Sequence, residues 1–155
     1  MSDVSPPSLP EPRRRVYIAS FWLAAVYNVI WGTTVILLPA WTLGLAGIET
    51  DAVGRLFWQC IGMFVLVFAI GYVALAREPE RYAVFLVIAL LGKIFGPIGF
   101  AYGAFYLDAL PRSLGWTILT NDLLWWPIWF AFAWETALRP IVRGRGRRWR
   151  STDET

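Results

Sequence analysis

The sequence predicts an all-α integral membrane protein, a polytopic bundle of four antiparallel transmembrane helices with both termini in the cytoplasm. Three observations predict this fold. Only 16% of the 155 residues are charged and 57% are hydrophobic, whereas about a quarter of an average soluble domain is charged. Nearly all charges lie outside four apolar runs, each as long as the roughly 20 residues that cross a hydrocarbon core. The runs also lack the polar face that a soluble helix repeats every 3.6 residues.

These runs define the expected domains. The first fifteen residues are rich in Pro and Ser and end in three arginines, so they are expected to form a disordered basic tail. The first apolar run is too long for a cleaved signal and is expected to stay as a helix. The transmembrane domain is predicted over 16–138, with spans at 16–38, 54–76, 82–106 and 114–138. A polybasic cytoplasmic tail is predicted over 139–155.

The connections predict how the spans are arranged. The first connection mixes Trp41 and Leu43 with Glu49, and we expect it along the outer interface, with Asp51 capping the second helix. The segments AREPER and LDALPRSLG are short turns. Short turns make successive helices antiparallel neighbours.

The basic residues predict the orientation. Eleven of the 14 Lys and Arg residues lie in the two tails and the second connection, whereas Arg55 and Arg112 lie on the other side. Short loops rich in these residues stay in the cytoplasm, which puts both termini inside, and we expect the bacterial inner membrane as the location. The C-terminal run RGRGRRWR is expected to attract anionic lipid headgroups rather than nucleic acid.

The composition excludes several chemistries. Cys60 is the single cysteine, so the chain can form neither an internal disulfide nor a CxxC pair. There is no histidine, which excludes a His-ligated haem, His-based metal sites and a histidine general base. We expect no metal, and whether the chain is an enzyme stays open, with a non-catalytic role favoured.

Lys93 is the most informative residue because it lies near the middle of the third span. A lysine at that depth costs about 2.5–3.5 kcal/mol on insertion scales, so its ammonium should face a counter-charge or a wet cavity. Asp122 is the acid well inside the fourth span and is the predicted partner. Pro97 and Pro127 are predicted helix breaks, which free the carbonyls of Lys93 and Leu123.

Three amides extend this cluster into an expected intramembrane polar site that opens outward: Asn28, Gln59 and Asn121. Two interpretations stay open. The cluster is either a functional site, or a set of interhelical hydrogen bonds that hold the bundle together at about 0.6–2 kcal/mol each.

Two further patterns mark helix faces. Gly92, Gly96, Gly99 and Gly103 form a small-residue stripe, which favours close helix packing and makes the third span the central helix. Trp125, Trp126 and Trp129 share a helical face with Asp122. They are expected either to pack in the core or to form an aromatic wall for a quinone or another planar lipophilic ligand.

Three segments carry a resemblance to a known group: YNVIWGTTVILLP, LLGKIFGPIGF and NDLLWWPIWF. The chain resembles small, uncharacterised bacterial four-helix membrane proteins that are DoxX-like in general shape. Lys93, Gly96 and Pro97 match the GK-x-x-GP element, and Asn121 and Asp122 begin the NDL-x-WW element. Some of these proteins are labelled alkyl hydroperoxide reductase, which implies a cysteine pair that this chain lacks. The resemblance implies quinone-coupled oxidation as one function.

Three hypotheses for function follow. The first is an intramembrane polar site for a small solute, a proton or a lipophilic ligand. The second is a non-catalytic accessory subunit of a larger membrane complex; the expected partners are membrane lipid and either further copies of the chain in a homo-oligomer or such a complex. The third is a DoxX-like, quinone-linked oxidoreductase subunit. No cofactor is evident from the residues themselves.

Overall fold

The computed structural model describes residues 9–138, which form helices joined by short turns and contain no strand. The first half holds α1 (Glu11–Leu37), the short α2 (Pro39–Leu45) and α3 (Ala52–Arg77). Next comes α4 (Ala83–Ala101), which continues as the π-helix η1 (Tyr102–Tyr106). The remainder consists of η2 (Arg112–Leu114), α5 (Gly115–Asn121), η3 (Leu123–Trp125), α6 (Trp126–Ala133) and the π-helix η4 (Trp134–Leu138). The all-α prediction is confirmed.

Three of these segments are long and apolar enough to cross a membrane: Glu11–Leu37, Ala52–Arg77 and Ala83–Tyr106. They correspond to the first three predicted spans. Large apolar side chains cover their outer surfaces, and Phe64, Ile70 and Val84 are 70%, 72% and 73% exposed. Such extended apolar surface is rare on soluble monomers and is compatible with a membrane protein.

The fourth predicted span is helical but is not one helix. It is divided at Asp122 into α5 and α6, with the 3₁₀ turn η3 between them. The sequence predicted a single span over 114–138 with a break at Pro127. In the structure Pro127 lies in the first turn of α6, where a missing N–H costs nothing, and the break lies upstream of it.

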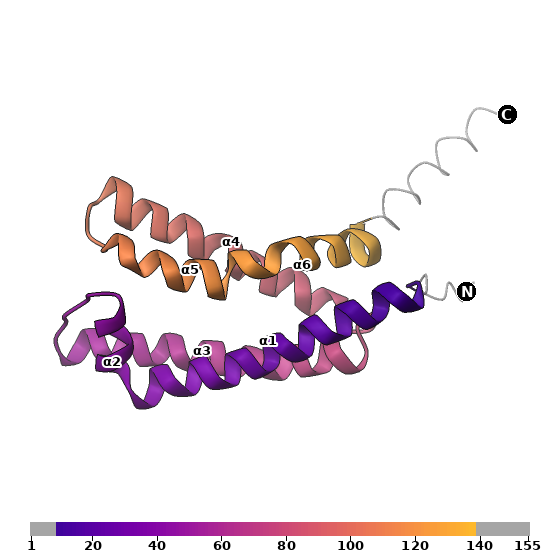
Figure 1. The fold of residues 1–155 in the computed structure, drawn as a ribbon, viewed down its shortest axis with the longest axis horizontal. Helices are drawn as coiled ribbons and strands as arrows, with labels where there is room; N and C mark the ends of the chain where they lie inside the picture. The colour runs from indigo at the N-terminus through magenta and orange to yellow at the C-terminus, as the bar shows by residue number, and fades with distance from the viewer. Residues whose placement is uncertain (1–8, 139–155) are drawn as a thin grey trace, which may run out of the picture.

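The helices form two hairpins (Figure 1). One pairs α1 with α3, and the other pairs α4 with α5 and α6. The backbones of α1 and α3 approach closely at Gly32 and Gly62, because a Cβ added at Gly32 would lie 2.8 Å from the Gly62 carbonyl oxygen. The glycine stripe predicted to pack the third span makes no such contact with the backbone of another helix. Glycine packing joins the first hairpin instead.

Buried aromatic rings join the two hairpins. Trp129 on α6 is fully buried, and its ring centroid lies 5.0 Å from that of Tyr72 on α3 and 6.2 Å from that of Phe21 on α1. Phe132, also on α6, contacts Phe21 edge-on at 5.2 Å. Edge-on and tilted ring pairs of this kind add to the free energy gained by burial.

The start of α1, the turn from α3 to α4 and the end of η4 lie together at one end of the molecule, which we call the terminal end (Figure 1). There Arg13 forms an ion pair with Glu135, and the Arg14 Nε lies 3.2 Å from Glu80 Oε1. These contacts hold residues that were expected in a disordered tail. α1 begins at Glu11, not at residue 16, and the predicted 1–15 tail is corrected accordingly; residues 1–8 and the predicted 139–155 tail lie outside the described residues.

The opposite end, which we call the α2 end, contains the first connection. Asp51 caps α3 there, and its Oδ1 accepts a hydrogen bond from the Gly54 N–H at 2.8 Å, so the predicted cap is confirmed. Trp58 on α3 donates through Nε1 to the Thr42 hydroxyl at 2.8 Å. This bond ties α2 to the first hairpin.

Candidate functional site

The break between α5 and α6 frees backbone carbonyls in the middle of the fourth segment. The helix ends at Asn121, and Asp122 follows with φ −118° and ψ −65°. A helix that ends there leaves its last carbonyls without intrahelical donors. The indole Nε1 of Trp125 turns back and donates to the Thr120 carbonyl at 3.1 Å. The carbonyl of Asn121 accepts from the Lys93 ammonium.

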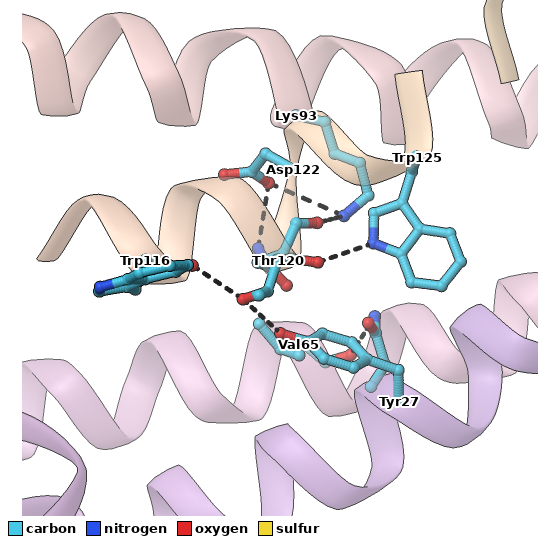
Figure 2. A network of polar contacts seen from close by, with 9 residues as sticks. Tyr27, Val65, Lys93, Trp116, Thr120, Asp122 and Trp125 are labelled. Carbon is cyan, nitrogen blue, oxygen red and sulfur yellow. Dashed lines mark hydrogen bonds and ion pairs between the residues drawn. The ribbon is translucent and has the colours of Figure 1, made fainter. Parts of the chain in front are cut away.

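Lys93 thus caps the carboxyl end of α5 from the neighbouring helix α4 (Figure 2). Its Nζ also lies 3.7 Å from Asp122 Oδ1, and both side chains are 7% exposed. The third neighbour is the Trp129 ring, whose centroid lies 5.3 Å from Nζ. A carbonyl, a carboxylate and an aromatic face therefore surround the ammonium, and this environment offsets much of the cost of its burial.

Asp122 is held in turn by its neighbours. The Asn121 side-chain amide donates to Oδ1 at 3.0 Å. The second oxygen, Oδ2, lies against α4, where a Cβ added at Gly96 would be 2.8 Å away. Among residues 9–138 no donor forms a hydrogen bond with Oδ2. The structure thus brings Lys93, Asn121 and Asp122 together and leaves one carboxylate oxygen unpaired.

The two prolines do not break the helices as predicted. α4 runs without interruption through Pro97 to Ala101. The Leu123 carbonyl, which we expected Pro127 to free, accepts from the Trp126 N–H. The 3₁₀ turn η3 satisfies it, because an i to i+3 bond replaces the missing i to i+4 bond.

Asn28 and Gln59 do not join the Lys93–Asp122 pair, because both form hydrogen bonds within the first hairpin. The Asn28 side chain on α1 donates to the Val65 carbonyl on α3 at 2.9 Å. Gln59 on α3 donates to the Ile36 carbonyl on α1 at 2.8 Å. Each amide thus bonds the backbone of the opposite helix, and together they clamp the first hairpin. Their hydrogen bonds are those of interhelical ties.

The three tryptophans do not form one wall. Trp125 stacks on Trp129 with ring centroids 5.3 Å apart, and both rings are buried in the aromatic cluster between the hairpins. Trp126 instead contacts Phe130 edge-on at 5.7 Å. The indole nitrogens of Trp126 and Trp129 are buried and have no hydrogen-bond partner in the described part of the chain. Because η3 breaks the helical period after Asp122, helical offsets from that residue do not predict a common face.

The four glycines of the stripe, which runs from α4 into η1, do not share the same surroundings. A Cβ at Gly92 or Gly99 would meet nothing within 4 Å. Gly96 contacts the Asp122 carboxylate, and a Cβ at Gly103 would lie 2.6 Å from a methyl carbon of Leu110 in the following turn. Two of the four glycines therefore leave room for a side chain, and two face open space.

Two residues that the sequence did not single out link the pair to a cavity. The Tyr27 hydroxyl on α1 donates to the Thr120 hydroxyl at 3.2 Å, which connects the two hairpins beside the break (Figure 2). Thr120 also lines a half-open cavity of about 160 Å³ between α1, α2 and α5. The lining is aromatic and hydroxyl-rich: Trp31, Thr42, Ser113, Trp116, Thr117 and Thr120, with Leu45 and Ala46. A single tyrosine or threonine in an apolar run gives no sequence signal of this kind.

The geometry limits the chemistry of the site. Within residues 9–138 no three His, Cys, Asp or Glu side chains come together as metal ligands do. The Lys93 ammonium is neutralised by the Asp122 carboxylate, and neither residue lines the cavity, so a ligand there would meet the aromatic and hydroxyl side chains instead. No protein-family model, curated protein or solved structure matches the chain. The DoxX-like resemblance therefore stays a prediction.

Proposed function

We propose that the chain is a four-crossing integral membrane protein that binds a small ligand from the non-cytoplasmic side, in the cavity beside the Lys93–Asp122 pair. The observation that carries this proposal is that Thr120 belongs both to the cavity lining and to the last turn of α5. Thr120 lines the cavity, and its carbonyl belongs to the helix end that Lys93 caps. A ligand in the cavity would therefore contact the segment that holds the ion pair.

The length of the last segment supports a fourth crossing. Residues 115–138 would extend about 36 Å at the helical rise, against roughly 30 Å of hydrocarbon. Asp122 and Glu135 are the charged residues in that stretch. Discontinuous helices occur at membrane depth where the freed backbone is buried in protein or lines a cavity. At this break the Lys93 ammonium and the Trp125 indole satisfy the freed carbonyls.

The arginines support the orientation. Arg13, Arg14, Arg77 and Arg81 belong to the segments of the terminal end, whereas Arg55 and Arg112 belong to the α2 end. The positive-inside rule assigns the terminal end to the cytoplasm. In a bacterial cell the protein would lie in the inner membrane, and the cavity at the α2 end would open away from the cytoplasm.

A small ligand is favoured over a quinone on the Trp125 face. The faces of Trp125 and Trp129 are occupied by each other, by Tyr27 at 6.0 Å and by Tyr72 at 5.0 Å. A planar ring could enter only by displacing core side chains. The cavity beside Thr120 needs no such displacement.

Cysteine accessibility tests the proposal. In a Cys60→Ala background, Thr117→Cys and Thr120→Cys should react with a membrane-impermeant maleimide added to the outside of intact cells. Two matched variants calibrate the result. Ala109→Cys in the exposed outer turn should label readily, whereas Ile70→Cys on the lipid-facing surface of α3 should not.

A third control tests the topology. Glu78→Cys in the turn between α3 and α4 should label only after the cells are permeabilised. The proposal is wrong if Thr117→Cys and Thr120→Cys stay unlabelled while Ala109→Cys reacts. It is also wrong if Glu78→Cys labels in intact cells, because the cavity would then face the cytoplasm.

A further inference from the structure

The hydroxyl groups of the cavity beside Thr120 define what kind of ligand it can take. Each hydroxyl has one proton. Thr117 donates to the Leu114 carbonyl at 2.7 Å and Thr120 to the Trp116 carbonyl at 2.9 Å. Thr42 donates to the backbone at the start of α2, and Ser113 donates to the Ala46 carbonyl across the cavity edge. With their protons used, these hydroxyls can take part in a further hydrogen bond only as acceptors. Thr42 is fully buried, so a ligand can reach those of Ser113, Thr117 and Thr120.

Two of the four hydroxyl oxygens already accept a hydrogen bond. Thr120 accepts from Tyr27 and Thr42 accepts from Trp58. Thr117 and Ser113 accept from no residue in the described part of the chain. A hydroxyl oxygen has two lone pairs. These hydroxyls can therefore bind a ligand that supplies several hydrogen-bond donors, whereas a carboxylate or phosphate would find side-chain donors only in the indole N–H groups of Trp31 and Trp116.

The remaining lining is aromatic. Trp31 and Trp116 contribute two indole rings to the cavity. The face of an indole ring is the aromatic surface that attracts cations most strongly. Oxygen acceptors together with indole rings favour a group that is both positively charged and rich in N–H donors.

We propose, resting on the function proposed above, that the cavity binds a primary alkylammonium group. Its volume of about 160 Å³ is that of a cavity which holds one benzene-sized molecule, so the group would be a short chain or a headgroup. Two sources share this chemistry: a free small amine, and the ethanolamine headgroup of a lipid in the outer leaflet.

Protection of a Leu45→Cys variant in the Cys60→Ala background tests the ligand class, because Leu45 is an exposed lining residue that supplies no hydrogen bond. The protein is reconstituted in phosphatidylcholine vesicles, and maleimide labelling is timed against rising concentrations of three probes of similar size. Propylammonium should slow labelling. Tetramethylammonium, which has charge but no N–H, and 1-propanol, which has a donor but no charge, should each need roughly tenfold more. Equal protection by either of them overturns the proposal, as does labelling that propylammonium leaves unchanged.

Two variants carry the test to named residues. Thr120→Val should raise the propylammonium concentration for half-protection roughly tenfold, because an acceptor for a charged donor is lost. Thr34→Val is the matched control, since the Thr34 hydroxyl also donates to its own helix, at Ile30, but lies outside the cavity. If the two variants behave alike, the cavity is not the site of protection and the proposal is overturned.

The lipid composition of the vesicles distinguishes the two sources of the amine. If the headgroup is the ligand, vesicles that contain phosphatidylethanolamine should slow Leu45→Cys labelling with no probe added, whereas labelling of Ala109→Cys stays the same. If a free amine is the ligand, the two kinds of vesicle should label alike and only propylammonium should protect. Failure of Thr117→Cys to label at all would instead remove the outward-open cavity, and with it the proposed function.

Discussion

Breaking the Lys93–Asp122 pair from one side should cost more than replacing both partners. Asp122→Asn keeps a side chain of the same shape but leaves the ammonium with the Asn121 carbonyl and the Trp129 ring alone. Lys93→Met leaves a buried carboxylate and an uncapped carbonyl at the end of α5. The double variant leaves no buried charge, so much of the penalty of each single change should disappear.

The magnitude follows from the geometry. At 3.7 Å and an effective dielectric constant of about 20, two unit charges attract by roughly 4–5 kcal/mol. Removing one partner of a buried pair typically costs about 3–5 kcal/mol, whereas replacing both is close to neutral. Polar groups in membrane proteins find substitute partners when the helices separate, which lowers measured interaction energies. We therefore expect a coupling energy of about 2 kcal/mol in the double-mutant cycle.

Reversible unfolding in mixed micelles with increasing dodecyl sulfate, followed by tryptophan fluorescence, gives the four free energies of unfolding. Asn28→Leu combined with Asp122→Asn is the control, because Asn28 donates to Val65 and shares no partner with Asp122. That pair should be additive within about 0.5 kcal/mol. If the Lys93→Met and Asp122→Asn effects are equally additive, the two charges do not stabilise one another and the reasoning fails.

The same unfolding assay checks three further expectations. Gly32→Ala should destabilise by about 1–3 kcal/mol, because its Cβ would lie 2.8 Å from backbone atoms of α3, while Gly99→Ala, with nothing within 4 Å, should stabilise by about 0.5–1 kcal/mol. Gly96→Ala should also destabilise, since its Cβ would meet the Asp122 carboxylate, and that penalty should vanish in an Asp122→Ala background. Glu135→Gln should cost less than about 1 kcal/mol, and less still at high salt, because its arginine partner is 63% exposed.

The all-helical fold class and the pairing of Lys93 with Asp122 could be predicted, because each follows from a large difference in free energy. Apolar runs of spanning length have few other stable states, and a lysine amid such a run must find a counter-charge. Asp122 was the natural candidate as the acid well inside the fourth run. The structure brings the two within 3.7 Å.

The position of the helix break could not be predicted, because several small contributions to the free energy of folding decide it. Proline predicts a break about one turn before itself, yet Pro127 also fits the first turn of a new helix. The tertiary partners then decide. Lys93 and the Trp125 indole satisfy the carbonyls of Asn121 and Thr120, so the helix can end at Asn121 with little loss. Lys93 lies 28 residues before Asn121, so the local sequence around the break does not reveal this contact.

Asn28 and Gln59 illustrate the opposite limit. Both lie in apolar runs at a depth similar to that of Asp122, so depth alone assigned them to one site with it. Depth does not specify which way a side chain points around its helix. The close glycine contact of α1 and α3 brings backbone carbonyls within reach of both amides, and each bonds the nearest one.

The structure also changes how the two interpretations of the polar cluster relate. A buried ion pair is weak evidence of stability, because apolar side chains of the same volume would hold two helices at least as well. An ammonium on a helix end does something that apolar side chains cannot, since it satisfies a carbonyl that the break has exposed. The break follows directly after Thr120 and Asn121, and Thr120 lines the cavity. Holding the helices together and shaping the cavity are therefore two consequences of one contact, and removing Lys93 would alter both.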